Sequence, residues 1–253
     1  MESKNLEQLR SWLRTELDSS GRPLGKGYKA SINLYKSPFG DFALKRVHGN
    51  FLFRRLREAT IRREFSVYQY LLDIPGIPKC LGLIDKKYLL LEHLPGQTFR
   101  KYEAKLQDRD KFFKDLLAIV KAMHQAGVAH GDLKRKDNIL VTQGEQPYVI
   151  DFGTAHLRKD RYSWWNWWVF KRIAQADYNA WIKLKYQRRF ENLSPADAKI
   201  YSPLPEERIA RLIRIIWQKL TLRRLRVFLR SRKKSNTLQT CLLYTSDAAD
   251  EGL

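Results

Sequence analysis

The chain has 253 residues, of which 43% are hydrophobic and 12% aromatic, so it can bury a sizeable core and is not a wholly disordered protein. It carries 48 lysines and arginines against 27 aspartates and glutamates, a net charge of +21 that attracts nucleic acid, anionic lipid headgroups or phosphorylated glycans. Its two cysteines, Cys80 and Cys241, give no disulfide framework, and no apolar run approaches the roughly 20 residues of a membrane-spanning helix, so we expect a cytoplasmic protein.

The first 96 residues predict one short helix followed by a β-rich region. In residues 3–17, Leu6, Leu9 and Leu13 recur at helical spacing, which indicates an amphipathic lead-in helix with a packing role. The elements predicted after it are a β-hairpin region at 22–47, a basic helix at 51–72 that ends at the Pro-Gly turn of 75–78, and strands at 80–84 and 87–92. Cys80 lies in an apolar run and is expected to be a core residue.

Beyond Gly96 the sequence favours helices. An apolar stripe between residues 112 and 123 predicts a helix that ends near Gly127, and apolar runs at 139–141 and 148–150 predict strands. We therefore expect a lead-in helix at 1–21, a small lobe at 22–96, a larger lobe at 97–240 and a tail at 241–253. The tail resembles the translation of a sequencing adapter, and we exclude it from reasoning about the fold.

The strongest motif pair is HGDLKRKDNILV at 130–141 followed by IDFG at 150–153. These segments resemble the catalytic loop and the metal-binding Asp-Phe-Gly motif of the protein-kinase-like superfamily. Asn138 and Asp151 lie 13 residues apart, the separation that a short hairpin needs to bring both side chains to one magnesium site. The resemblance implies an α+β bilobal protein-kinase-like fold, with a small β-rich N-lobe that binds the nucleotide and a larger helical C-lobe.

An upstream segment, LGKGYKASI at 24–32, resembles the glycine-rich loop that covers the nucleotide in this superfamily. Gly25 and Gly27 match its first two glycines, and Ala30 stands where the third usually falls. Lys45 follows about one strand later, which would let it reach the α- and β-phosphates of ATP beneath the loop.

Two further nucleotide-side features are implied by the same resemblance. Glu64, on the helix predicted at 51–72, is the favoured partner that holds this lysine in place, and Glu58 on the same helix is the competing candidate. The segment 91–94 is expected to present backbone groups to adenine, which makes Glu92 and Leu94 candidate nucleotide-binding residues.

The resemblance also assigns the catalytic roles. Phosphoryl transfer requires positioning and charge neutralisation, so Asp132 is expected to orient the acceptor hydroxyl and take its proton, and Lys134 to neutralise the γ-phosphate. Asn138 and Asp151 are expected to hold Mg²⁺ against the phosphates of ATP.

Two departures from the family pattern stand out. Six steps separate Asp132 from Asn138 where five are usual, so Asp137 falls at the usual offset and competes for the metal. We favour Asn138, because a strand-like run follows it directly, and whether Asp137 contributes stays open. Gly131 replaces the usual arginine, which leaves no obvious partner for a phosphorylated activation loop.

The segment after Gly153 suggests the class of acceptor. No Ala-Pro-Glu motif is present, and YSWWNWWVF at 162–170 leads into a strongly basic region. This combination of aromatic and basic residues, together with His-Gly-Asp at 130–132, resembles the bacterial lipopolysaccharide-core kinases, which phosphorylate heptose or 3-deoxy-manno-octulosonic acid (Kdo). It implies a lipid-linked glycan acceptor, and a basic amphipathic helix expected at 206–230 would dock the enzyme on anionic lipid at the inner face of the inner membrane.

Two alternatives remain. Small atypical Ser/Thr protein kinases of the RIO or Bud32 type also have a compact lobe and no activation segment, and they act near RNA, so RNA or a protein substrate would explain the basic charge equally well. A catalytically dead binding module is disfavoured, because Lys45, Asp132, Asn138 and Asp151 are all present.

Overall fold

The computed structural model describes residues 8–9, 11–13, 15, 21–26, 30–38, 40–47, 54–158 and 163–203. The chain divides into two units, residues 1–202 and 203–253, and the elements described belong to the first. Gly27, Cys241, the helix predicted at 206–230 and the tail at 241–253 lie outside the described residues.

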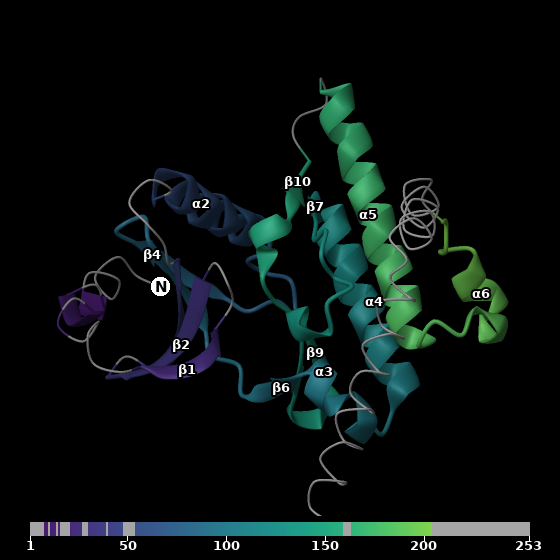
Figure 1. The fold of residues 1–253 in the computed structure, drawn as a ribbon, viewed down its shortest axis with the longest axis horizontal. Coiled ribbons are helices and arrows are strands. Elements are labelled where there is room, and N and C mark those ends of the chain that lie inside the picture. The colour runs from purple at the N-terminus through teal and green to yellow at the C-terminus, as the bar shows by residue number, and fades with distance from the viewer. Residues whose placement is uncertain are drawn as a thin grey trace, which may run out of the picture. The chain divides into compact units, whose positions relative to one another are not determined.

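A five-stranded antiparallel sheet in the order β1-β2-β3-β5-β4 dominates the N-terminal part of this unit (Figure 1). Its strands are β1 (Arg22–Lys26), β2 (Ala30–Ser37), β3 (Gly40–Val47), β4 (Cys80–Ile84) and β5 (Tyr88–Glu92). The helix predicted at 51–72 is α2 (Arg54–Tyr70), which contacts β3, β4 and β5. The predicted hairpin region and the two later strands are all present.

The central strand β3 sends alternate side chains to opposite faces of the sheet, as a period of two requires. Phe42 packs in one cluster with Leu9 and Leu13, which belong to the helical turns described between residues 8 and 15. Ala43 joins the larger core cluster on the other face. Lys45, two residues further along, follows Ala43 to that face, which is the face that α2 contacts.

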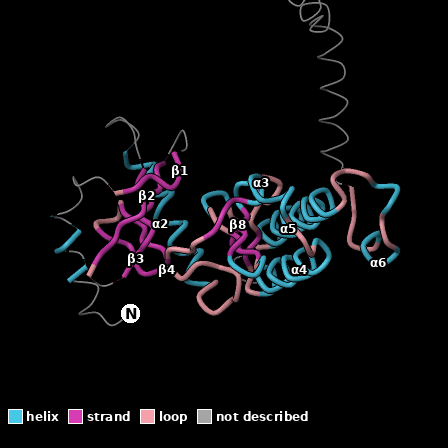
Figure 2. The backbone as a smooth tube through the Cα atoms, turned by 90° about the horizontal axis from the view of Figure 1, so that it is seen from below, coloured by secondary structure: helices cyan, strands magenta, loops and turns pink. Residues whose placement is uncertain are grey.

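The rest of the unit is mainly helical, as predicted. Its helices are α3 (Phe99–Tyr102), α4 (Arg109–Gln125), α5 (Trp164–Lys185) and α6 (Pro195–Ala198). Its short strands form a three-stranded sheet, β6 (Gly96–Thr98), β8 (Ile139–Thr142) and β9 (Pro147–Val149), and a pair, β7 (Val128–Ala129) and β10 (His156–Leu157). Figure 2 shows the sheet strands gathered with α2, and α4 and α5 running alongside each other.

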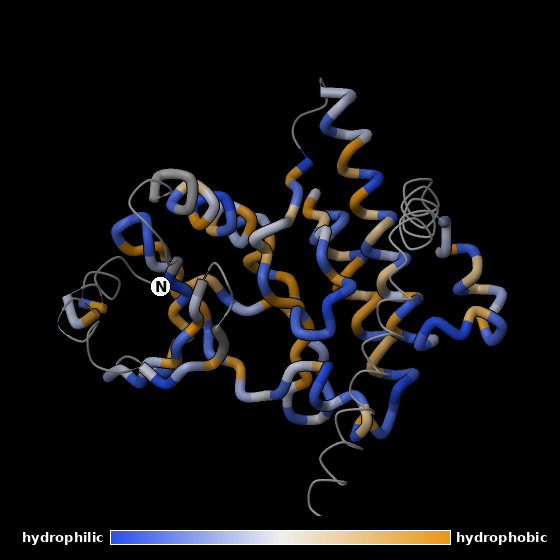
Figure 3. Tube along the Cα trace, in the orientation of Figure 1, coloured by the Kyte–Doolittle hydropathy of each residue, from blue (hydrophilic) through white to orange (hydrophobic). Residues whose placement is uncertain are grey.

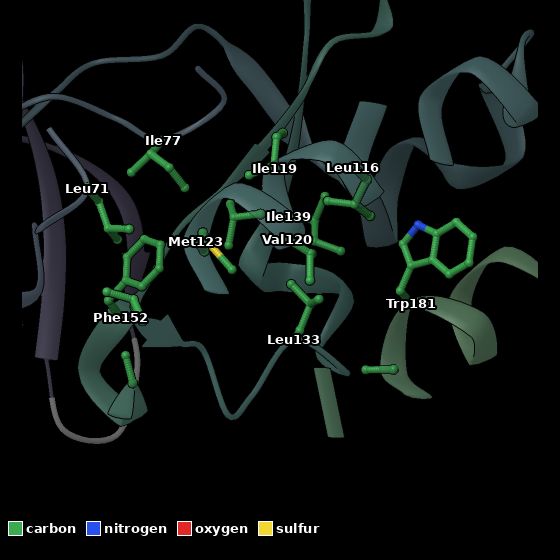
Figure 4. Packing of buried hydrophobic residues seen from close by; sticks show 14 of the residues in the cluster. Leu71, Ile77, Leu116, Ile119, Val120, Met123, Leu133, Ile139, Phe152 and Trp181 are labelled. Atoms are coloured by element: carbon green, nitrogen blue, oxygen red, sulfur yellow. The ribbon is translucent and has the colours of Figure 1, made fainter. Parts of the chain in front are cut away.

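The main core is continuous from α2 and the adjoining face of the five-stranded sheet to α4, α5 and the three-stranded sheet (Figure 4). Apolar and polar residues alternate along α5 in Figure 3. Phe170, Ala174, Asp177 and Trp181 lie on a buried face, and near the C-terminal end residues 179–182 are all buried. Trp181 on that face is 1% exposed, and its Nε1–H donates to the Phe113 carbonyl of α4 at 2.8 Å. Cys80 packs against the same core, and burial raises the pKa of its thiol to about 11.

Within the described part of the chain, none of the helices combines the length and the apolar character that crossing a bilayer demands.

Candidate active site

Strand β3 and helix α2 bring two buried opposite charges together. Lys45 is 7% exposed and Glu64 2% exposed, and the lysine Nζ lies 2.7 Å from Oε1 and 2.8 Å from Oε2 of Glu64. Glu64 belongs to the buried stripe of α2 with Ile61 and Tyr68, where a carboxylate needs a charged partner to offset its desolvation. Glu64, and not Glu58, is thus the α2 carboxylate that meets Lys45.

A second carboxylate, Asp151, completes a triad around Lys45. Its Oδ1 accepts from the lysine Nζ at 2.8 Å. Burial alone would lower the pKa of Lys45, but Glu64 and Asp151 outweigh burial and raise it. Burial alone would raise the pKa of Asp151, but the charge of Lys45 outweighs it and lowers this pKa. Both groups are therefore charged at neutral pH.

The backbone of Asp151 is held in an unusual conformation. Its φ of 66° is in the left-handed region, which non-glycine residues enter rarely and chiefly at functional sites. Its side chain remains 40% exposed although one oxygen binds Lys45. Part of this carboxylate is therefore open to a cation, and carboxylate oxygens are ligands that Mg²⁺ prefers.

The loop that follows β7 carries Asp132 and is oriented by a buried histidine. The Nε2 of His130 lies 3.0 Å from the Ile150 carbonyl, and its Nδ1 accepts the backbone N–H of Asp132 at 3.2 Å. A carbonyl can only accept, so Nε2 carries the hydrogen and Nδ1 is free to accept from Asp132. One neutral tautomer satisfies both contacts and fixes the backbone at Asp132.

Asn138 and Asp137 differ in their surroundings. Asn138 is 4% exposed, and its Nδ2 donates to the Asp132 carbonyl at 3.0 Å, which leaves the amide oxygen as its remaining polar atom for a metal. Asp137 instead accepts from Nε of Arg100 at 2.8 and 2.9 Å, and this hydrogen bond lowers the pKa of its carboxyl. Asn138 is thus bonded to Asp132 within the catalytic loop, whereas the carboxylate of Asp137 is paired with Arg100 of α3.

Lys134, the second residue predicted to be catalytic, is exposed on the same loop, two residues after Asp132. Its neighbour Arg135 forms an ion pair with Asp132, with Nη1 3.6 Å from Oδ2. The carboxylate of Asp132 therefore lies beside positive charge on its own loop.

The remaining residues predicted to bind the nucleotide lie in or directly after strands of the five-stranded sheet. Gly25 is in β1 opposite Ile32, next to a register shift in the β1–β2 pairing. Glu92 ends β5, where its backbone N–H donates to the Lys79 carbonyl at 2.8 Å and its Oε2 accepts from the Lys79 N–H at 3.0 Å. Leu94 lies in the three-residue link between β5 and β6.

A residue that the motifs did not reveal, Asp177 of α5, anchors the catalytic loop. Asp177 is 1% exposed, and its carboxylate accepts from the backbone N–H groups of His130 at 2.7 Å and Gly131 at 2.9 Å. The Nε2 of His124 lies 3.2 Å from the same carboxylate. The helical spacing of this carboxylate from Ala174 and Trp181 could have indicated that Asp177 is buried, but not which groups it binds.

The backbone at position 131 suits glycine. Its φ is 77°, and a Cβ there would lie 3.2 Å from the Thr154 carbonyl oxygen. A larger residue would strain the backbone at the point where Asp177 holds it.

Phe152 joins the three parts of the site. Its ring, 1% exposed, packs edge-to-face on Tyr68 of α2 with centroids 5.1 Å apart, and lies 5.1 Å from the ring of His130. Helix α2, the turn after Asp151 and the catalytic loop therefore share one packed contact.

A family model for the protein kinase domain matches residues 19–180. A serine/threonine-protein kinase of Arabidopsis thaliana, PEPKR2, is 28% identical over 53% of this chain and 29% of its own length. A probable serine/threonine-protein kinase of Dictyostelium discoideum, MARK-C, is 28% identical over 54% of this chain and 19% of its own. The serine/threonine-protein kinase ppk8 of Schizosaccharomyces pombe is 36% identical over 33% of this chain and 17% of its own.

The chain thus spans less than a third of the length of these relatives, and all three are eukaryotic. They support the superfamily resemblance and give no support to the narrower one with lipopolysaccharide-core kinases.

Proposed function

The chain belongs to the protein kinase family, and on that premise we propose that it phosphorylates a serine or threonine hydroxyl of a protein. Membership of the family implies ATP as the phosphoryl donor, Mg²⁺ as its metal and an alcohol group as the acceptor. The protein acceptor is the alternative weighed from the sequence, and the named relatives favour it over a glycan.

The triad of Lys45, Glu64 and Asp151 carries the proposal. An ammonium held 2.7 Å from Glu64 and 2.8 Å from Asp151 is positioned without further ordering, so it can bind phosphate oxygens of ATP at little entropic cost. Mg²⁺ supplies neutralisation of the phosphate charge, and Asn138 and Asp151 are the residues that would hold it.

Asp132 acts on the acceptor in this proposal. Its backbone is fixed by His130 and its carboxylate lies 3.6 Å from Arg135, so it can orient the hydroxyl and accept its proton as the new bond to phosphorus forms and ADP leaves. Lys134 would stabilise the charge of the transferred phosphoryl group.

A glycan hydroxyl is the second candidate acceptor, and one observation favours it. Only six residues, 158–163, separate β10 from α5, and a segment of this length offers little platform for an extended peptide. A sugar of the lipopolysaccharide inner core, heptose or Kdo, would need no such platform.

The two acceptors are distinguished by supplying both to the full chain. Radiolabelled ATP with Mg²⁺ should label serine or threonine in a protein and peptide mixture, as shown by acid hydrolysis of the product, and Asp132→Asn should abolish the label. If only dephosphorylated lipopolysaccharide is labelled, the acceptor is a glycan hydroxyl and the proposal of a protein acceptor is wrong. Binding of ATP without transfer to water, protein or glycan would contradict both.

A further inference from the structure

The first turn of α5 exposes four tryptophans in five residues. Trp164 is 73% exposed, Trp165 58%, Trp167 48% and Trp168 44%, whereas Trp181 of the same helix is buried. Figure 1 shows this end of α5 extending beyond β7 and β10, away from the part of the helix that contacts α4. An exposed aromatic patch of this density marks an interaction surface.

The turn that carries the patch is firmly held. Ser163 caps α5, accepting the backbone N–H of Asn166 at 3.4 Å. The side-chain amide of Asn166 lies 2.9 Å from Nε2 of His156 and donates to the Leu157 carbonyl at 3.2 Å, which ties the turn to β10. The four rings are therefore presented on a fixed scaffold and not on a loose end of the helix.

Cations lie one turn further along the same side of α5. The Nζ of Lys171 is 3.4 Å from the ring centroid of Trp167, and the guanidinium carbon of Arg172 is 5.3 Å from that of Trp168. Residues three and four apart on a helix share a face, so apolar rings at the tip are followed by positive charge. Rings that reach the apolar boundary with cations at headgroup level are typical of interfacial membrane binding.

We propose that the Trp164–Trp168 turn, with Lys171 and Arg172, docks this protein on an anionic lipid bilayer. The tryptophan edges lie in the interface, and the exposed Lys171 contacts acidic headgroups, while Arg172 adds positive charge beside it. The net charge of +21 complements such a surface. This proposal does not depend on which hydroxyl the enzyme phosphorylates.

The ring contacts favour a bilayer over single-stranded RNA. Nucleobases bind aromatic side chains through free ring faces. Here Trp165 and Trp168 stack on each other with centroids 5.0 Å apart, and Lys171 covers a face of Trp167. These contacts cover one face of each of the three rings, which reduces the ring face available for base stacking and leaves the edges free for the headgroup region.

The test uses the full chain with vesicles of phosphatidylcholine, with and without phosphatidylglycerol. Wild type should cosediment with the anionic vesicles only, with a blue shift of tryptophan emission and quenching by lipids brominated near the headgroup. Replacement of Trp164, Trp165, Trp167 and Trp168 by alanine should weaken binding at least about tenfold and remove the blue shift. Lys171→Glu should weaken binding with the rings intact.

A double variant, Tyr70→Ala with Phe190→Ala, is the matched control, because these aromatics are 58% and 39% exposed outside the patch. It should bind vesicles as wild type does, and all variants should retain ATP binding. If the quadruple variant proves unstable, Trp164→Ala alone, at the most exposed position, should still weaken binding. Unchanged vesicle binding in the tryptophan variants, no binding by wild type, or tighter binding of single-stranded RNA through the same tryptophans would overturn the proposal.

Discussion

Asp132 and Asn138 are joined by a hydrogen bond. The side-chain amide of Asn138 donates to the carbonyl of Asp132, and the backbone N–H of Asp132 donates to His130. The backbone at Asp132 is thus fixed from both sides, while its carboxylate stays available. Substitutions that keep this backbone but change one side-chain function should separate binding from catalysis.

Asp132→Asn should leave ATP affinity nearly unchanged and lower kcat by about 10²–10⁴-fold, because it removes the proton acceptor and keeps the shape and the backbone contacts. Calorimetric titration with ATP and single-turnover kinetics measure the two effects separately. A parallel loss of ATP affinity would show that Asp132 contributes to the nucleotide site.

Asn138→Ala should cost far more activity than Asp137→Ala, by about 10²-fold or more, because it removes both the proposed metal ligand and the amide that braces Asp132. Asp137→Ala should be mild, since its exposed pair with Arg100 contributes little. The Mg²⁺ concentration needed for half-maximal activity should rise in the first variant only. The reverse ranking would make Asp137 the ligand.

Helix α2 is positioned by contacts at several points along its length. Glu64 meets Lys45, Tyr68 packs on Phe152, and Nη2 of Arg63 donates to the Ala155 carbonyl at 2.9 Å. The last bond joins α2 directly to the segment after Asp151. It therefore holds in register the two elements that supply the carboxylates around Lys45.

Arg63→Ala should lower kcat/KM for ATP more than it lowers the free energy of unfolding, because Arg63 is itself exposed and its bond to the buried Ala155 acts on the placement of Glu64. Arg62→Ala is the matched control, since Arg62 is the exposed neighbour on the same helix, and it should leave kcat/KM unchanged. Equal effects of the two substitutions would assign the loss to surface charge and not to the bond with Ala155.

On the scale of the whole unit, several carboxyl groups are ionised more readily than usual. Burial would raise the pKa of Asp151 and of Asp197, but Lys45 outweighs it at the first, and Lys185 with Tyr186 outweighs it at the second, so both values are lowered. The backbone N–H groups of Gln107 and Asp108 lower the pKa of Glu145. A lowered folded-state pKa stabilises the fold above the unfolded value, and this contribution is lost as pH falls through the folded one.

The free energy of unfolding should therefore fall steadily below about pH 4 and change little between about pH 5 and 8 from these groups. Asp197→Asn should lower the free energy of unfolding at pH 7 and make its fall below pH 4 less steep, because the variant has no carboxyl group to protonate at this position. Lys185→Met should give the same flattening, since it removes the partner. Urea denaturation at a series of pH values measures the free energy of unfolding. If it falls below pH 4 as steeply in both variants as in wild type, the assignment to this pair is wrong.

The sequence by itself determined the order of the strands and helices around the site and the residues of its motifs. Short runs between glycines predicted the hairpin region that holds Lys45, and a basic stretch ended by a Pro-Gly turn predicted the helix that holds Glu64, because turn residues and local composition act over a few residues. Only the tertiary structure brought Asp177 to His130, 47 residues away, and Arg63 to Ala155. Such contacts depend on how α2 and α5 pack against the catalytic loop, and local spacing holds no information about that packing.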